Sequence, residues 1–194
     1  MSKLIYFIPM SLDGFIADEG DDFDWSTPDD EVMAFINELH RPIGTYLYGR
    51  KNYETMTVWE TPDAMSGLTP AMTEFGPIWQ AADKIVYSRT LAAVSTSKTR
   101  LERAFEPQLV RDLKAQLPHD MSVAGPNLAA QAIRAGLVDE CHLLVAPVML
   151  GGGKRVLPGN IVVELDLLAE RRVGRGWVYL RYGMRLDRVS GQPG

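Results

Sequence analysis

Apolar runs and turn residues alternate along this chain in a pattern typical of strands that lead directly into helices. Residues 4–10 form a nearly continuous apolar run, as expected for a strand that is covered on both faces. Shorter apolar runs at 46–48, 84–87 and 122–124 predict three further strands, and each is followed by a polar or glycine-containing turn. The pattern therefore favours a sheet with helices between its strands.

Helical spacing of apolar residues follows several of these turns. Thr27 is expected to cap a helix that places Val32, Phe35 and Leu39 on one face, with Asp30 at the capping-box position. Between residues 57 and 80, proline and glycine interrupt the pattern, so only a short helix is expected there. The predicted helices lie after Thr27, from Gly49 to Met56, near 70–75, around 109–117, and from Gly125 to Gly136.

The stretch 122–153 combines a strand, a glycine turn, a helix and a second strand, most simply a crossover in a parallel sheet. Residues 161–173 and 177–186 predict two antiparallel strands. We expect an α/β fold with a central, mostly parallel sheet flanked by helices and a C-terminal antiparallel hairpin. It would form one domain over residues 1–188, followed by a flexible tail at 189–194.

Three of the strand-end turns carry groups that suit a phosphate. Arg50 and Arg89 follow the second and third predicted strands, and Gly125 opens a helix after the fourth. Carboxyl ends of parallel strands meet at one edge of a sheet, and a helix N-terminus attracts anions. Each turn alone is ordinary, but together they predict a site for a phosphorylated ligand.

Composition narrows the class of protein. The chain has 194 residues, of which 46% are hydrophobic, so it can bury a full core. Its net charge of −5 without a basic stripe argues against a nucleic-acid partner, and no apolar stretch is long enough to cross a membrane. The N-terminal run is interpreted as a strand and not as a signal peptide. The single cysteine, Cys141, is compatible with a reducing cytoplasm.

Other chemistries find little support in the residues. Cys141 and His142 are neighbours on a predicted strand and so point to opposite faces, while His40 and His119 stand alone and are interpreted as surface histidines. No metal site is predicted. Asp13 and Asp30 are the carboxylates of interest, although a turn residue and a capping residue explain them equally well.

Several segments together resemble the dihydrofolate reductase-like superfamily. More narrowly, they resemble the group that includes the reductase domain of the bifunctional riboflavin-biosynthesis deaminase-reductase. The resemblance implies a three-layer fold, NADPH as the hydride donor and a pterin-like or pyrimidine-like acceptor. The segments are SLDGFIA, DFDW, YGRKNYETM, KIVYSRTL and SVAGPNLAAQAIRAGLVDECHLLVAPVMLGGGKRVL.

The resemblance also implies positions for cofactor-binding residues. Two would line the nicotinamide, four would hold phosphates at a helix start, two would lie near the 2′-phosphate, and four would lie under the pyrophosphate. Ala124 stands where the family usually has the first of two glycines, Asn52 where it commonly has threonine, and Pro9 where a backbone N–H would face the carboxamide. The residues are, in that order, Ile16 and Ala17; Gly49, Arg50, Lys51 and Asn52; Ser88 and Arg89; and Gly125, Pro126, Asn127 and Leu128.

On the substrate side, Trp25, Pro28 and Asp30 align with the tryptophan, proline and acidic residue of folate-reducing enzymes. Asp30 is the candidate catalytic residue, as a proton relay, and Asp13 and Trp25 are candidate substrate contacts. The leading hypothesis is an NADPH-dependent reductase of a small nitrogen heterocycle or related carbonyl compound. The alternative is a non-catalytic nucleotide-binding module. The resemblance and the predicted C-terminal hairpin also indicate a homodimer.

Overall fold

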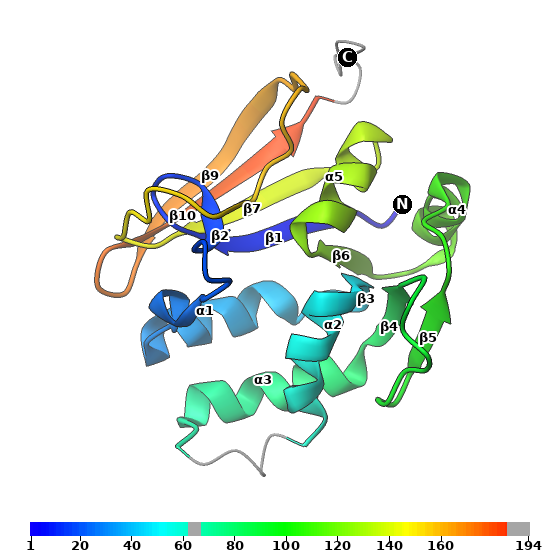
Figure 1. The fold of residues 1–194 in the computed structure, drawn as a ribbon, viewed down its shortest axis with the longest axis horizontal. Helices are drawn as coiled ribbons and strands as arrows, with labels where there is room; N and C mark the ends of the chain where they lie inside the picture. The colour runs from blue at the N-terminus through cyan, green and yellow to red at the C-terminus, as the bar shows by residue number, and fades with distance from the viewer. Residues whose placement is uncertain (62–66, 186–194) are drawn as a thin grey trace.

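The structure of the protein is a computed structural model, and it describes residues 1–61 and 67–185. In this part of the chain, one mixed sheet of eight strands has the order β5-β4-β3-β6-β1-β7-β10-β9, and helices cover both of its faces (Figure 1). The predicted mostly parallel α/β fold with a C-terminal hairpin is confirmed. The predicted tail at 189–194 and the domain end at residue 188 lie outside the described residues.

The strand β1 lies near the middle of the sheet and pairs in parallel with β6 on one side and β7 on the other. Only β9 and β10 bring antiparallel pairing into this sheet. A separate pair, β2 with β8, lies beside the end of β1. The strands are β1 (Leu4–Met10), β2 (Phe15–Ala17), β3 (Ile43–Gly49), β4 (Asp83–Tyr87), β5 (Thr99–Glu102), β6 (Asp120–Ala124), β7 (Glu140–Val145), β8 (Lys154–Arg155), β9 (Leu165–Val173) and β10 (Trp177–Met184).

The helices α4 and α5 lie on one face of the sheet, and α1 and α3 lie on the other (Figure 1). The helix α2 follows β3 directly and continues into the short 3-10 helix η2. The helices are η1 (Asp24–Ser26), α1 (Asp30–His40), α2 (Arg50–Met56), η2 (Thr57–Glu60), α3 (Pro70–Ala81), α4 (Pro107–Gln116) and α5 (Pro126–Arg134).

Two details of the predicted helices are wrong. The cap of α1 is Asp29, whose carboxylate accepts a hydrogen bond from Val32 N, whereas Thr27 bonds back to Asp24 O. The helix α3 runs twelve residues and passes through Pro77, where the pattern predicts a break. Burial of Phe75 and Trp79 on the face turned toward the sheet offsets the backbone hydrogen bond that proline removes.

One further difference concerns an edge of the sheet. The strand β5 was not predicted, because its sequence TRLE has little apolar character and its residues are exposed or half-buried at the sheet edge. In β10 the side chain of Tyr179 is buried, and its ring contacts Phe35 of α1 edge-on at 4.9 Å. Helix α1 therefore covers one face of the C-terminal hairpin.

The pairing of β2 with β8 places Ile16 and Ala17 beside the carboxyl end of β1. Gly153, just before β8, makes this pairing possible, because a Cβ there would lie 2.1 Å from the carbonyl oxygen of Ala17. Its φ of +125° is also a conformation that side-chain-bearing residues rarely adopt. Only glycine lets the two backbones approach this closely.

We predict that Gly153→Ala is markedly more destabilising than Gly151→Ala. Gly151 also has positive φ, but nothing lies within 4 Å of its Cβ position, so alanine there should cost only the backbone strain of about 1–2 kcal/mol. At Gly153 the clash should add at least about 2 kcal/mol. Urea unfolding of both variants measures the difference, and equal free energies of unfolding would contradict the close approach.

Candidate functional site

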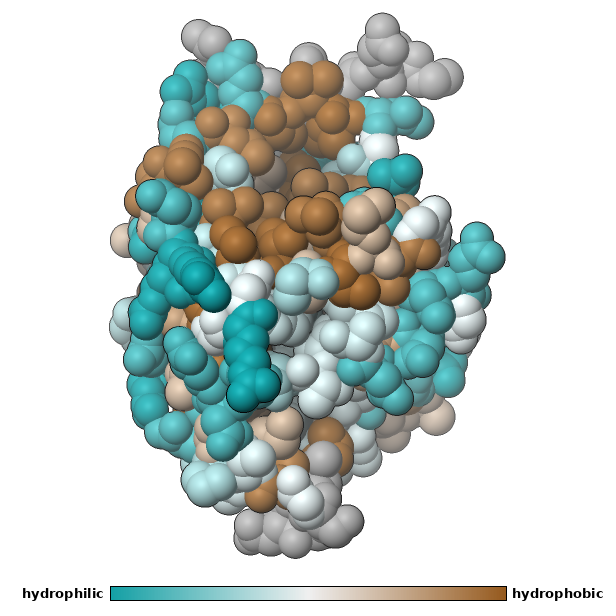
Figure 2. Space-filling model, turned by 90° about the vertical axis from the view of Figure 1, so that its left-hand side faces the viewer, coloured by the Kyte–Doolittle hydropathy of each residue, from teal (hydrophilic) through white to brown (hydrophobic). Residues whose placement is uncertain are grey.

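A cavity of about 720 Å³ opens where the parallel strands end, within the size range of small-molecule and cofactor sites. Its walls come from β1, β3, β4 and β6 of the sheet and from α1, α2 and α5. Figure 2 views the molecule from the side toward which β1 points and shows a hollowed surface, with hydrophobic residues gathered in its upper half and hydrophilic residues along its margins. Chain segments far apart in sequence therefore contribute to one site.

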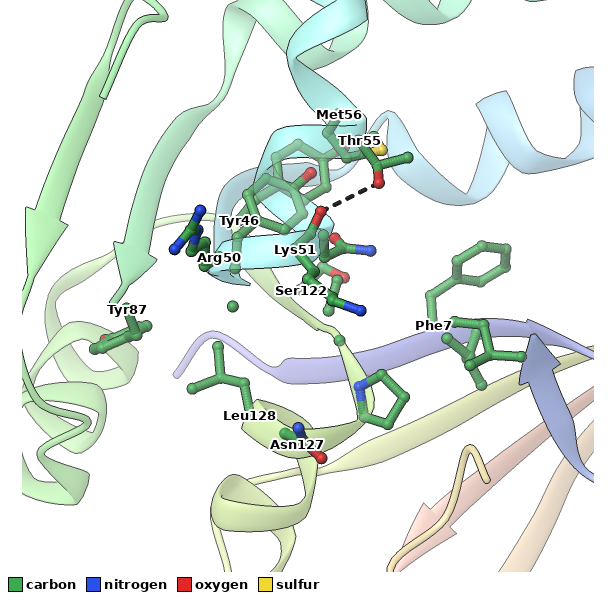
Figure 3. Close-up of a pocket in the computed structure, with 18 of the residues that line it drawn as sticks. Phe7, Tyr46, Arg50, Lys51, Thr55, Met56, Tyr87, Ser122, Asn127 and Leu128 are labelled. Carbon is green, nitrogen blue, oxygen red and sulfur yellow. Dashed lines mark hydrogen bonds between the residues drawn. The ribbon is translucent and has the colours of Figure 1, made fainter. Parts of the chain in front are cut away.

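The three predicted turns meet at this cavity. Arg50 at the start of α2, Arg89 after β4 and Gly125 after β6 all line it. Two cations that the sequence reasoning missed, Arg103 and Lys154, line it as well. We call the part of the wall formed by Arg50, Lys51, Arg89, Arg103 and Lys154 the cationic half. Figure 3 shows Arg50 beside the end of its strand, with Tyr87 on the same side and Phe7 on the opposite side.

The start of α5 is built to approach α2 closely. Gly125 has a φ of +94°, and a Cβ there would lie 3.6 Å from the Cβ of Asn52. Pro126 opens the helix and has no N–H, and Leu128 and Ala129 donate their N–H groups to the carbonyl oxygen of Gly125. No side chain caps the helix, so the Asn127 N–H has no side-chain acceptor. A buried oxygen, Asn52 Oδ1, also lacks a hydrogen-bond partner among the described residues. Both features leave polar groups for a ligand to satisfy.

All twelve residues predicted to bind the cofactor line this cavity. Some already have protein partners: Arg50 pairs with Glu54 at 2.7 Å, and Ser88 Oγ accepts hydrogen bonds from the N–H groups of Thr90 and Leu91. Arg89 is exposed at the mouth. The twelve are Ile16, Ala17, Gly49, Arg50, Lys51, Asn52, Ser88, Arg89, Gly125, Pro126, Asn127 and Leu128.

Asp13, a predicted substrate contact, does not line the cavity. Its carboxylate accepts a hydrogen bond from the Ser11 hydroxyl at 2.6 Å and from the N–H of Gly151 at 2.7 Å. The Ser11 hydroxyl, followed by the Gly151 N–H, lowers the pKa of Asp13 to about 2. The Asp13 side chain thus joins the turn after β1 to the loop after β7.

Asp30 and Trp25 are likewise absent from the cavity wall. Asp30 is the exposed first residue of α1, and Trp25 packs with the apolar cluster between α1 and the C-terminal hairpin. The structure therefore does not bring these two predicted residues together with the cofactor-binding residues. Helix α1 instead turns Met33, Ile36 and His40 toward the cavity.

Sequence reasoning missed this second part of the wall. Met33, Ile36 and His40 follow one helical face, and Tyr46 and Tyr48 follow one face of β3, so helix and strand periodicity carried the signal. Nothing in the local pattern indicates that the helix face and the strand face enclose a cavity. That outcome depends on how α1 packs against the sheet.

Two general features bear on the chemistry of the site. Across residues 1–61 and 67–185, no three His, Cys, Asp or Glu side chains gather in a way that could hold a metal ion. In the same residues, no helix combines the length and the apolar character needed to span a bilayer.

Comparison with known proteins gives a consistent match. The family model of the RibD C-terminal domain matches residues 2–179. A curated protein of Bacillus subtilis, the uncharacterized protein YyaP, is 30% identical over 186 residues, which is 93% of this chain and 94% of YyaP.

Solved structures show the same fold at low sequence identity. A candidate riboflavin biosynthesis protein of Shewanella sp. PV-4 is 19% identical with a TM-score of 0.73, and the match covers 95% of this chain and 99% of that one. The dihydrofolate reductase of Enterococcus faecalis, solved with NADP(H), is 14% identical with a TM-score of 0.59, covering 94% and 96%. The deaminase/reductase of Thermotoga maritima is 13% identical with a TM-score of 0.64, covering 94% of this chain but only 56% of that protein. The dihydrofolate reductase-like fold is thereby confirmed.

His40 lies deep in the cavity wall and is not a surface residue, which corrects the sequence interpretation. His40 Nδ1 is hydrogen-bonded to the Tyr46 hydroxyl at 3.0 Å, and the Phe7 and Phe75 rings contact the imidazole edge-on. Burial, with a smaller effect of nearby His142, lowers the pKa of His40 to about 4. His40 is therefore neutral at physiological pH.

We predict that the protein loses stability as the pH falls from about 6.5 toward 4. In that window the unfolded chain binds a proton at His40 and the folded chain does not, so the difference amounts to about 2 kcal/mol between pH 7 and pH 5. Urea unfolding of wild type and His40→Gln at both pH values measures it. The variant should show a smaller loss, with His142 accounting for part of the remainder, and an identical loss in both proteins would contradict the assignment.

Proposed function

The chain belongs to the RibD C-terminal domain family, and from that membership we propose that it is an NADPH-dependent reductase of a small nitrogen heterocycle or a related carbonyl compound. The observation that carries the proposal is the cationic half, where five Lys and Arg side chains line one cavity, from the start of α2, the turns after β4 and β5, and β8. Only one carboxylate, Asp21, lies among the described lining residues, and it is paired with Lys51 at 2.5 Å. Such a wall suits a ligand with several phosphates.

Different lining residues suit different parts of the cofactor. The open helix start at Gly125 would hold the pyrophosphate, and Arg89 with Arg50 would hold the 2′-phosphate. Ile16 and Ala17, fixed by the pairing of β2 with β8, would contact the nicotinamide. When bound, NADPH supplies the hydride. The protein contributes the orientation of the two reactants and the exclusion of water between them.

A non-catalytic nucleotide-binding module is the alternative function. It would keep the cationic half and bind NADPH without reducing any acceptor. Following NADPH absorbance with folates, pterins, a ribosylaminopyrimidine and simple carbonyl compounds distinguishes the two. Consumption that depends on an acceptor supports the reductase, and binding without turnover on every acceptor favours the module.

We predict that the protein binds NADPH more tightly than NADH and that Arg89 provides much of the preference. A charge-assisted hydrogen bond contributes roughly 1.5–3 kcal/mol, so Arg89→Ala should weaken NADPH binding about tenfold or more and leave NADH binding nearly unchanged. Arg50→Ala should have a smaller effect on the NADPH affinity, because the Arg50 guanidinium already forms an ion pair with Glu54. Titration of cofactor fluorescence measures all of these affinities.

Arg111→Ala serves as the matched control, since Arg111 is an exposed arginine of α4 that does not line the cavity. It should leave both affinities unchanged. Equal affinity of the wild type for NADPH and NADH would sink the cofactor assignment.

We also propose that the protein is a homodimer that forms through the C-terminal hairpin. In the described sheet β9 is an edge strand, and its Leu165, Leu167 and Leu168 are 42%, 54% and 50% exposed. An apolar edge of this kind is a liability unless another chain covers it. A second copy related by two-fold symmetry presents the same surface and would cover this apolar edge.

We predict that light scattering at micromolar concentration gives about twice the chain mass of 21.6 kDa, and that Leu167→Glu shifts the protein toward the monomer. At a symmetric interface the new glutamate would be buried in both chains, and neither carboxylate would have an oppositely charged partner. Leu109→Glu is the control, because Leu109 of α4 is 50% exposed and lies away from the hairpin. A monomeric wild type would refute the dimer.

A further inference from the structure

The half of the cavity that faces α1 and α3 differs chemically from the cationic half. Phe7 of β1, Met33 and Ile36 of α1, Met56 of α2, Trp59 of η2 and Phe75 of α3 line it, and we call this part of the wall the apolar lobe. Aromatic contacts hold it together: Phe7 lies against His40, His40 against Phe75, and Phe75 against Trp59, with ring centroids 4.9, 5.4 and 5.0 Å apart. The described lining residues on α1, η2 and α3 include no Lys, Arg, Asp or Glu.

The polar atoms of the lobe belong to groups without charge. Tyr46 stacks on Tyr48 with centroids 5.5 Å apart, the Tyr46 hydroxyl bonds His40 Nδ1, and Trp79 Nε1 donates to the Tyr48 hydroxyl at 3.0 Å. Burial keeps these groups neutral, because it lowers the pKa of His40 and raises those of both tyrosines. Ser122, which also lines the cavity, carries a neutral hydroxyl. The lobe therefore offers a few neutral hydrogen-bonding atoms set in an aromatic wall.

This arrangement discriminates between classes of acceptor. A phosphate or carboxylate in the lobe would lose its hydration and find no cation there, which is strongly unfavourable. A flat uncharged ring would bury apolar surface against Phe7, Met33 and Trp59, at roughly 25 cal/mol per Å², and could bond one polar atom to Tyr46. Asp30 lies outside the wall, so α1 brings no carboxylate into the lobe that could pair with a cationic ligand.

We propose that the apolar lobe is the acceptor site and that it takes an uncharged, mostly apolar aromatic ring compound, held at one heteroatom by the Tyr46 hydroxyl and His40, and excludes phosphorylated compounds. Describing the ring as an acceptor rests on the proposed reductase function. The binding specificity of the lobe does not, because it follows from the wall alone.

The test uses a pair of probes that differ by one phosphate, 2-naphthol and 2-naphthyl phosphate. Calorimetric titration is made on protein saturated with NADP⁺, so that the cationic half is occupied and no reaction occurs. We expect one 2-naphthol per chain, bound at least about tenfold more tightly than the phosphate, a difference of about 1.4 kcal/mol. Equal affinities or tighter binding of the phosphate would overturn the proposal.

Two variants locate the binding. Met56→Lys places an ammonium group in the lobe and should weaken 2-naphthol and strengthen the phosphate, so that the ratio of affinities moves toward one or beyond it. Ala115→Lys adds the same charge to an exposed position of α4 that does not line the cavity, and should change neither. Tyr46→Phe should weaken 2-naphthol roughly three- to tenfold, as expected for one hydrogen bond. An unchanged ratio in Met56→Lys together with an unchanged affinity in Tyr46→Phe would place the probe elsewhere and refute the assignment.

The outcome is separable from that of the proposed function. If NADP⁺ does not bind, the cofactor assignment fails, and titration of 2-naphthol into cofactor-free wild type and Tyr46→Phe still tests the lobe. If NADP⁺ binds and 2-naphthol does not, the cofactor assignment stands and the specificity of the lobe is wrong.

Discussion

Parallel pairing of β1 with β6 and with β7 is the constraint on which the rest of this structure depends. It aligns Tyr6 with Val123 on one side and with Cys141 on the other, so three strands end at the same edge of the sheet. The strand β3 pairs in parallel with β6, and β4 pairs in parallel with β3, so these two strands run in the same direction as β1. The turns that follow these strands therefore lie at one edge of the sheet. The cavity is the space that those turns and the adjoining helices surround.

The cavity divides into two environments because different layers supply its walls. Strand-end turns cannot bury their polar backbone, so they bring exposed cations and open helix N–H groups to one half. Helices α1 and α3 must bury an apolar stripe against the sheet, and their residues give the other half its aromatic character. A ligand that spans both halves would be anionic at one end and uncharged at the other. The proposed pair of a phosphorylated cofactor and a neutral ring has this distribution of charge.

A buried carboxylate helps to hold the antiparallel hairpin on this parallel core. Glu140 at the start of β7 accepts hydrogen bonds from Arg181 of β10 at 2.7 and 2.9 Å and from Lys3 at 2.6 Å. His142 bonds the same carboxylate, and its other ring nitrogen bonds the Tyr179 hydroxyl. These partners hold the pKa of Glu140 near 2 against the opposing effect of burial. The cluster links the first strand, the last parallel strand and the hairpin, at the end of β7 opposite the cavity.

The sequence alone determined the α/β layers, the C-terminal hairpin, the longer strands and helices in their order, and three of the strand-end turns that line the cavity, but not the short strands β2, β5 and β8. Those features depend on local periodicity and turn chemistry, and the convergence of turns follows from parallel pairing itself. Tertiary structure decided the rest. Asp13 and Asp30 carry carboxylates that could contact a substrate or relay a proton. The Asp13 carboxylate instead bonds a neighbouring loop, and Asp30 is exposed to solvent. The apolar lobe exists only because α1 packs on β3, with His40 against Tyr46. The hydrophobic pattern of each element does not specify how the two elements pack together.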